Sequence, residues 1–321
     1  MDELESLPGY PCIGVRNQVA ILLAIPRLQQ REVGAFFRNR VDSEETITQS
    51  GGGAENVRDQ EENNTSGNDT ADEEVVFIEF GQLWGSIVAD YTALSLSYPT
   101  DMLPALSGIA SVIGSSYRPG RYFAGIWERD MHYQLAWSPN LDDDEAECFR
   151  PLQERYMAPS FSWASRIGPV SFPWECHIVS VCKIVEAGTN LNGVDTYGKV
   201  TGGCIRLEGK LIRCRVEQYD PRYWQCGISV WNGQEWEKRQ SSVEFDTEED
   251  RMELLDEQAY CFELFRARPW NENEKSEPDT VYALLLQEAM GVGSMTFTRV
   301  ALAQTEGEDF DGVPDSLITV V

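Results

Sequence analysis

The sequence predicts an α+β fold in which a helical block is followed by an antiparallel β-rich domain, sandwich or barrel-like. Apolar residues recur at three- and four-residue spacings across residues 80–137, a pattern typical of amphipathic helices. Beyond Pro159, short β-branched and apolar runs follow one another between Gly and Asp turns, which predicts strands. The chain has 321 residues, 42% of them apolar and 11% aromatic. It is therefore long and apolar enough for a substantial core.

We divide the chain by composition. Residues 1–40 form a short helical segment, 41–75 an acidic disordered linker, 76–140 the helical block, 158–303 the antiparallel β domain and 304–321 an acidic tail that we expect to be frayed. Residues 41–75 hold eleven acidic residues and one base, Arg58. Such a composition buries too little apolar surface to offset the entropy of ordering its backbone. A specific acidic binding segment remains the alternative for this stretch.

Three helices are expected in the helical block. The first has an apolar face made of Phe80, Leu83, Trp84, Ile87, Val88 and Tyr91. The second begins near Thr100, a plausible N-cap, with Asp101 favoured in the first turn by the helix dipole, and Gly114 can close it. The third spans residues 122–137.

The strands are expected at residues 179–185, 203–216, 227–231, 242–245, 260–265, 281–287 and 295–302. Residues 203–216 predict a hairpin with its turn at Glu208-Gly209-Lys210. The segment APSFSWAS, residues 158–165, begins an extended stretch because Pro159 disfavours helix for its predecessor. We expect Trp163 to wedge between the helical block and the sheet as a structural joint. A ligand-contacting loop is the alternative.

The formal net charge of −27 argues against nucleic acid and against anionic membranes as partners. No secretory signal is recognisable, and the short apolar run at residues 19–25 is less than half of a membrane span. Eight cysteines form no Cys-x-x-Cys pair, which favours reduced thiols and a cytoplasmic protein.

No catalytic apparatus is recognisable, and we expect no enzyme activity, no catalytic residue and no cofactor. The histidines are His132 and His177. His132, in the expected third helix, is interpreted as a surface or satisfied core residue. A Cys176/His177 nucleophile pair is conceivable, but adjacent strand residues point to opposite faces.

No metal site is expected either. The acidic run at residues 142–145 lacks the spacing and the glycine of a calcium loop, and Cys204, Cys214 and Cys226 are too irregularly spaced for zinc. A stripe of tryptophans could stack on sugars, although core and turn-edge packing is the ordinary explanation. Its members are Trp224, Trp231, Trp236 and Trp270.

Several segments, read in order, resemble the region that follows the signature domain of fungal heterokaryon incompatibility (HET) proteins. APSFSWAS at 158–165 is the most specific of them. The others are WGSIVADY at 84–91, DMLPALSGIA at 101–110, YFAGIW at 122–127, LAW at 135–137, YGKV at 197–200, GGCIRLEG at 202–209, VEFD at 243–246, YALLL at 282–286 and FTRVAL at 297–302. Their collinear order carries the resemblance.

The resemblance implies the function. In that family an upstream effector domain, similar to Toll/interleukin-receptor-like folds, triggers cell death, but its signatures are not found before Trp84. Residues 91–98 imitate the first signature without its Trp-Gly. We therefore expect a HET-type protein lacking the effector domain, with a regulatory or interaction role in self/non-self recognition and a protein partner. Residues 1–75 either replaced that domain or came from a truncated gene. The alternative is a carbohydrate-binding or hydrolase-like β module.

Overall fold

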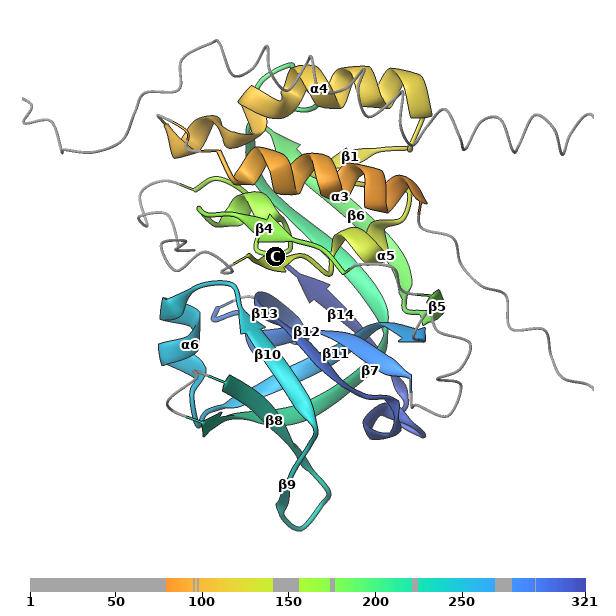
Figure 1. Cartoon of the computed structure of the whole chain (residues 1–321), viewed down its shortest axis with the longest axis vertical. Helices are drawn as coiled ribbons and strands as arrows, with labels where there is room; N and C mark the ends of the chain where they lie inside the picture. Colours follow the sequence, from red (N-terminus) through yellow and green to blue (C-terminus); the bar gives the residue numbers. More distant parts are fainter. Residues whose placement is uncertain are drawn as a thin grey trace, which may run out of the picture. The chain divides into compact units, whose positions relative to one another are not determined.

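Helices come first along the chain and strands later, as the sequence predicts (Figure 1). The computed structural model describes residues 79–140, 156–173, 177–220, 225–268 and 279–321, apart from Ser95, Ser97 and Val292. The predicted segments 1–40 and 41–75 lie outside the described residues. The α+β prediction is confirmed: a helical block precedes a large, mostly antiparallel sheet.

The first two predicted helices are present. The helical elements are α3 (Glu79–Thr92), η2 (Pro99–Asp101), α4 (Met102–Tyr117), α5 (Met131–Gln134), η3 (Trp163–Ser165), α6 (Glu248–Leu254) and η5 (Gly307–Phe310). In α3, the predicted face is buried at Phe80, Trp84, Ile87, Val88 and Tyr91. This face lies on one side of the helix because its members are three or four residues apart.

Helix α4 differs from the prediction at both ends. Thr100 lies in the 3₁₀ turn before the helix instead of capping it, and the helix runs through Gly114 to Tyr117. Arg118 ends it with a left-handed φ of 49°. Gly114 serves packing: a Cβ there would lie 2.7 Å from Oη of Tyr197 and 2.9 Å from Cη2 of Trp127. Only a residue without a side chain allows this close approach.

The predicted third helix is wrong. Residues 122–137 form a tight hairpin of β1 (Tyr122–Phe123) and β2 (Ile126–Trp127), followed by the single turn of α5. Ala124 and Gly125 have φ values of 49° and 98°, and Asp130 has 53°. These left-handed residues turn the chain where a helix would require negative φ. The apolar spacing reflects burial of both sides of a folded-back segment.

The remaining strands belong to the β domain or to a small pair next to the helices. They are β3 (Ser138–Pro139), β4 (Val170–Ser171), β5 (His177–Val181), β6 (Lys183–Leu191), β7 (Val200–Asp220), β8 (Gln225–Trp231), β9 (Trp236–Lys238), β10 (Ser241–Phe245), β11 (Gln258–Arg268), β12 (Thr280–Glu288), β13 (Thr296–Glu306) and β14 (Asp315–Val320).

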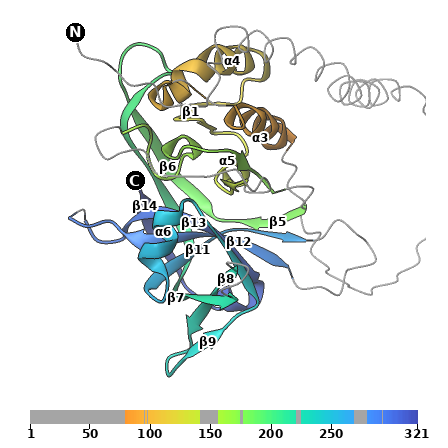
Figure 2. The same cartoon turned by 60° about the vertical axis from the view of Figure 1, so that its left-hand side comes forward.

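The large sheet closes on itself. β7 pairs with β11, β11 with β12, β12 with β13, β13 with β14, and β14 with β7 again. The closed path makes the domain barrel-like, with β8 and β9 continuing from β7 (Figure 2). Its interior is an apolar cluster from several strands, capped by Leu254 of α6 and Phe310 of η5.

β7 is one continuous strand of 21 residues, so the predicted hairpin at 203–216 is wrong. Gly209 pairs with Ser316 in the middle of the strand instead of forming a turn. A Cβ on Gly209 would lie 3.0 Å from Cζ of Phe262 and 3.1 Å from Cβ of Cys182. The glycine therefore permits close packing of side chains across the strand. Sequence composition alone does not distinguish a glycine with this packing role from a glycine in a turn.

The expected frayed tail after Gln304 is also wrong. β13 continues to Glu306, and β14 pairs with β7 in antiparallel and with β13 in parallel orientation. Ile318 and Val320 are fully buried, so alternate β14 side chains enter the core. The acidic residues of the tail lie at or before the start of β14, at positions 306, 308, 309, 311 and 315, and they conceal this period-two pattern in the composition. Among the described residues, no helix has the length and apolarity needed to cross a membrane.

Candidate functional site

The segment that resembles the HET family most specifically, residues 158–165, is completely buried. It does not extend as predicted but turns twice. The Ser162 amide donates to the Pro159 carbonyl at 3.0 Å, and the Ser162 hydroxyl accepts from the Ala164 amide at 3.0 Å, which caps η3. A serine at this position satisfies a backbone donor that would otherwise be unpaired, and this favours the turn over a strand.

One side of the segment binds the helical block. Nε1 of Trp163 donates to the Gly125 carbonyl oxygen at 2.9 Å, and Nε1 of Trp84 donates to the same oxygen at 2.8 Å. The Ser162 hydroxyl donates to the neighbouring carbonyl of Ala124. The Trp163 ring also meets the Tyr91 ring edge-on at 6.3 Å. The turn between β1 and β2 is therefore held from α3 and from η3 together.

The other side of the segment binds the sheet, through Ser160 instead of Trp163. The Ser160 amide donates to the backbone oxygen of Val321 at 3.0 Å, and its hydroxyl donates to that oxygen too. The same hydroxyl accepts from the backbone amide of Arg299 at 3.0 Å. Residues 158–165 thus connect helical block and sheet, with Trp163 bonded to the helical block and Ser160 to the sheet.

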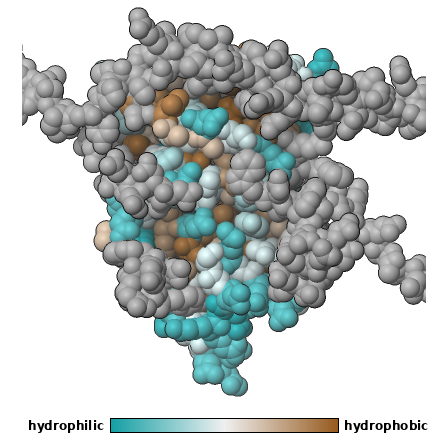
Figure 3. Space-filling model, viewed as in Figure 1, coloured by the Kyte–Doolittle hydropathy of each residue, from teal (hydrophilic) through white to brown (hydrophobic). Residues whose placement is uncertain are grey.

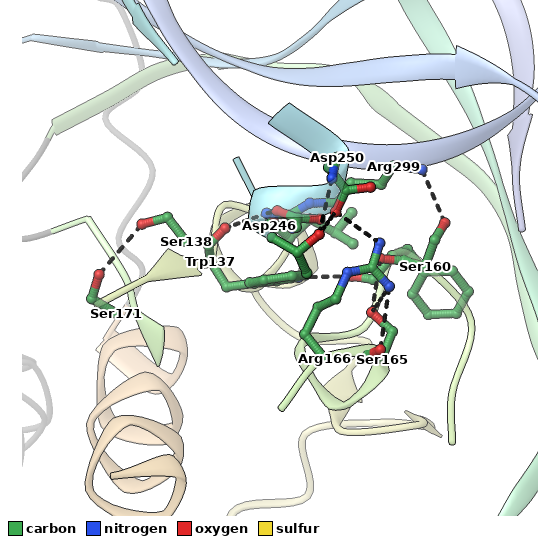
Figure 4. Close-up of polar contacts among 12 residues, drawn as sticks. Trp137, Ser138, Ser160, Ser165, Arg166, Ser171, Asp246, Asp250 and Arg299 are labelled. Carbon is green, nitrogen blue, oxygen red and sulfur yellow. Dashed lines mark hydrogen bonds and ion pairs between the residues drawn. The ribbon is translucent and has the colours of Figure 1, made fainter. Parts of the chain in front are cut away.

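Arg299, whose backbone amide bonds to Ser160, carries a buried guanidinium (Figure 4). Arg299 on β13 forms an ion pair with Asp246, 3.1 Å from Nη2 to Oδ1, and both side chains are fully buried. Its Nη1 donates to the Leu135 carbonyl at 2.8 Å, and its Nη2 donates to the Trp137 carbonyl. The guanidinium carbon lies 3.6 Å from the centroid of the Trp137 ring, a close cation–π contact.

Burial lowers the pKa of Arg299 to about 10, and Asp246 opposes this decrease. The group is therefore still a cation near neutral pH. It forms hydrogen bonds to carbonyl and carboxylate oxygens supplied by two separate parts of the chain, residues 135–137 and Asp246, which is the chemistry of a structural cross-link.

A second buried pair lies next to the first. Nη2 of Arg166 is 3.5 Å from Oδ2 of Asp250, and Nη1 donates to the Ser165 carbonyl at 3.2 Å. Asp250 is fixed in turn by Thr247, whose hydroxyl donates to Oδ2 at 2.6 Å and accepts from the Asp250 amide. This Thr247 cap places α6 over the end of the joint (Figure 4).

Among the predicted candidates, His132 has a defined place. It lines a shallow groove of about 470 Å³ between α5, the β1–β2 hairpin and β6. Its Nε2 lies 2.6 Å from the Cys182 carbonyl oxygen, so Nε2 must carry the proton. Burial lowers the pKa of His132, and burial raises the pKa of the Cys182 thiol to about 12. A neutral histidine bonded to a carbonyl is a satisfied structural residue, in agreement with the ordinary interpretation.

Charged groups around this groove form exposed ion pairs. Arg121 lies 2.9 Å from Glu128, Lys183 lies 2.7 Å from Glu208, and Arg206 lies 3.5 Å from Glu186, which borders the groove. These pairs account for the charged side chains that line the groove.

Several predicted candidates lie outside the described residues. They are Cys176, the acidic run at 142–145, Trp224, Trp270 and the side chain of His177. Cys214 lies with its Sγ 3.5 Å from that of Cys261 inside the barrel, away from any zinc-like grouping with Cys204 and Cys226. Within the described ranges no cluster of three potential metal-ligating side chains occurs.

Sequence reasoning missed the four charged residues of the joint: Arg166, Asp246, Asp250 and Arg299. The sequence does indicate a role for Arg299, because FTRVAL places a cation inside an apolar strand. A charge buried in such a strand requires an ion-pair or hydrogen-bond partner. The identity of that partner depends on the pairing of β10 with β13, which the sequence pattern does not give.

Comparisons with family models, with curated proteins and with solved structures find no match to this chain.

Proposed function

We propose that this chain is a HET-type fungal protein acting without the family's effector domain, and that it binds a protein partner in the cytoplasm as a regulatory component of heterokaryon incompatibility. The proposal concerns the residues present in this sequence. It assigns no chemical reaction to them.

The supporting observation is that segments resembling the family meet at one buried joint. Trp84 of WGSIVADY and Trp163 of APSFSWAS both donate to the carbonyl of Gly125 in YFAGIW. Arg299 of FTRVAL bonds to Trp137 of LAW and to Asp246 of VEFD. These residues are used to hold the helical block on the sheet. We therefore expect the protein partner to bind the exposed loops and strands whose positions this joint fixes.

Expression of the chain by itself in a fungal host tests the proposal. We expect normal growth and no turnover of NAD or of hydrolase substrates by the purified protein. Growth arrest caused by this chain alone, or NAD cleavage, would show that it carries effector activity and would overturn the proposal. Arg299→Ala, which breaks the joint, is the control for effects of misfolded protein.

A carbohydrate-binding β module remains the second candidate, because Trp231 is 42% exposed. Its support is weaker. The Trp231 and Trp236 rings are 5.3 Å apart and inclined by 58°, so they form no common plane for a sugar chain. A glycan array compared between the natural chain and Trp231→Ala decides the question. A flat response to all glycans removes this candidate.

A further inference from the structure

Two arginines and two tryptophans share one outer face of the sheet, which we call the Arg–Trp face: Arg213 and Arg215 of β7, Trp231 of β8 and Trp236 of β9. Trp231 is directly opposite Trp236, and Arg215 is opposite Ser229, two residues from Trp231 on the same strand. Opposed residues of antiparallel strands point to the same side, as do residues two apart. The inward positions, such as Cys214 and Val230, belong to the core.

The Arg215 guanidinium of this face has an unused donor, whereas Arg213 already bonds to the Tyr260 side chain. Arg215 lies with its guanidinium carbon 5.0 Å from the centroid of the Trp236 ring, and its buried Nε has no hydrogen-bond partner in the described part of the chain. Neither Arg213 nor Arg215 forms an ion pair with a described residue, whereas Arg121, Arg206, Arg239, Arg251, Arg266, Arg268 and Arg299 do. The chain has 53 acidic and 26 basic residues, so acidic partners are abundant. Even so, these two neighbouring arginines form no ion pair with a described residue.

Acidic groups near the face are already engaged. Glu217 accepts a hydrogen bond from the Ser229 hydroxyl at 2.7 Å and lies 3.3 Å from Nζ of Lys238. Glu288 accepts from the Tyr260 hydroxyl at 2.9 Å. Neither carboxylate forms an ion pair with Arg213 or Arg215, although Tyr260 contacts both Glu288 and Arg213. The three cations Arg213, Arg215 and Lys238 outnumber these two carboxylates, so the face offers net positive charge to a partner.

The strand that borders the face is open to pairing. β9 ends the hydrogen-bonded order of the sheet, and among the described strands it pairs with β8 alone. Hydrophilic residues gather over this β8–β9 end of the molecule (Figure 3). An edge strand presents unpaired amides and carbonyls to a second chain. Added strands use that edge for affinity and use side chains at alternate positions for specificity.

From these observations we infer that the Arg–Trp face binds an extended acidic segment of a partner protein. The segment lies over the outer side of β7, β8 and β9, where its carboxylates bond to Arg215 and Arg213, and its backbone continues to the open edge of β9. The methylene groups of the segment's acidic side chains contact the rings of Trp231 and Trp236. Arginine suits this role because its planar fork binds a carboxylate through two parallel hydrogen bonds. The inference rests on the proposed function, since it names the surface and the chemistry of the partner.

The net charge of −27 supports the Arg–Trp face as the binding surface for an acidic segment. An acidic segment is repelled by most of such a protein, and the repulsion between exposed charges is screened beyond about 10 Å at 0.1 M salt. Local attraction by two unpaired arginines therefore decides where the segment binds.

The test uses a fluorescent peptide of about ten residues, alternating glutamate and threonine, titrated with the full chain and followed by anisotropy. We expect saturable binding that Arg215→Gln weakens about tenfold and Arg213→Gln or Trp231→Ala weakens to a lesser degree. A matched peptide with glutamine in place of glutamate should not bind. Arg118→Gln is the control variant, since Arg118 is an exposed arginine that follows the last residue of α4 and has no described ion pair. It should bind like the natural chain.

Equal binding of the glutamine peptide, equal weakening by Arg118→Gln, or no binding at all would overturn the inference. A homodimer, seen by sedimentation velocity and abolished by Arg215→Gln, would also overturn it, by making a second copy the occupant. Thermal melts identify variants that lose binding by unfolding, and Arg215→Lys, which keeps the charge without the fork, should restore only part of the affinity. The proposed function fails separately, through growth arrest or catalytic turnover.

Discussion

Arg299 and Asp246 form an ion pair at 3.1 Å with both side chains inaccessible to solvent, between strands that the sequence places far apart. Asp246 also follows directly on β10, and its amide donates to the Val300 carbonyl at 2.9 Å. The pair therefore fixes β10 against β13 at the place where β13 meets the helical block.

Asp246→Ala should destabilise the protein by about 3–5 kcal/mol, because it leaves the Arg299 guanidinium buried without its counter-charge. Urea unfolding measures the change. The double variant Asp246→Leu/Arg299→Met should recover part of the loss. Recovery should be incomplete, since the carbonyls of Leu135 and Trp137 then lose their donors. Glu128→Ala at an exposed pair is the control and should leave the midpoint unchanged.

Gly125→Ala should cost about 2 kcal/mol or more, since φ is 98° and a Cβ would lie 2.7 Å from Cε2 and Nε1 of Trp163. Gly233→Ala is the matched control: its φ is 99°, but no atom lies within 4 Å of the added Cβ. It should lose about 1 kcal/mol from backbone strain alone. Equal losses at both glycines would contradict the close packing of Trp163 on the β1–β2 turn.

Trp84→Phe and Trp163→Phe should be non-additive, because both indoles donate to the Gly125 carbonyl. Either single variant leaves that oxygen one donor. The double variant leaves it none in a buried place, so the double loss should exceed the sum of the single losses by about 1 kcal/mol. Strict additivity in a double-mutant cycle would count against the shared acceptor.

The stability that His132 contributes should decrease as the pH falls. Burial lowers the folded-state pKa of His132 below its ordinary value of 6.5. Protons then bind the unfolded chain more readily, so the stability that this residue contributes is present above about pH 6.5 and is lost as the pH falls toward the lowered value. His132→Gln keeps a donor for the Cys182 carbonyl and cannot titrate. Its stability should fall less between pH 7.5 and 5.5 than that of the natural chain.

The sequence predicts best where one physical rule acts alone. The face of α3 and the strands at 281–287 and 295–302 follow from apolar periodicity, and the structure confirms them. Prediction fails where a glycine or a left-handed residue can serve either in a turn or in close packing, because the sequence does not show which role it has. Gly209 and Gly114 permit close contacts instead of a turn and a helix end, whereas Gly125 turns a chain segment that has helical spacing.

The joint was predicted in part. The sequence predicts that helical block and sheet meet at APSFSWAS, because a buried tryptophan after a proline suits such a position. The structure confirms this meeting point. Its partners could not be predicted, since Arg299, Asp246 and Val321 approach it only through the pairing of β10 and β14 with their neighbours. Long-range register is a property of the whole sheet and not of any one segment.

Co-expression of this chain with an effector-bearing HET-type protein in a fungal host tests the central claim most directly. The measurement is the dose of effector protein needed for growth arrest, with the natural chain, with Arg215→Gln/Trp231→Ala and with Arg118→Gln at equal abundance. The account predicts that the natural chain and Arg118→Gln shift this dose and that Arg215→Gln/Trp231→Ala does not. A dose unaffected by the natural chain would contradict a regulatory binding role.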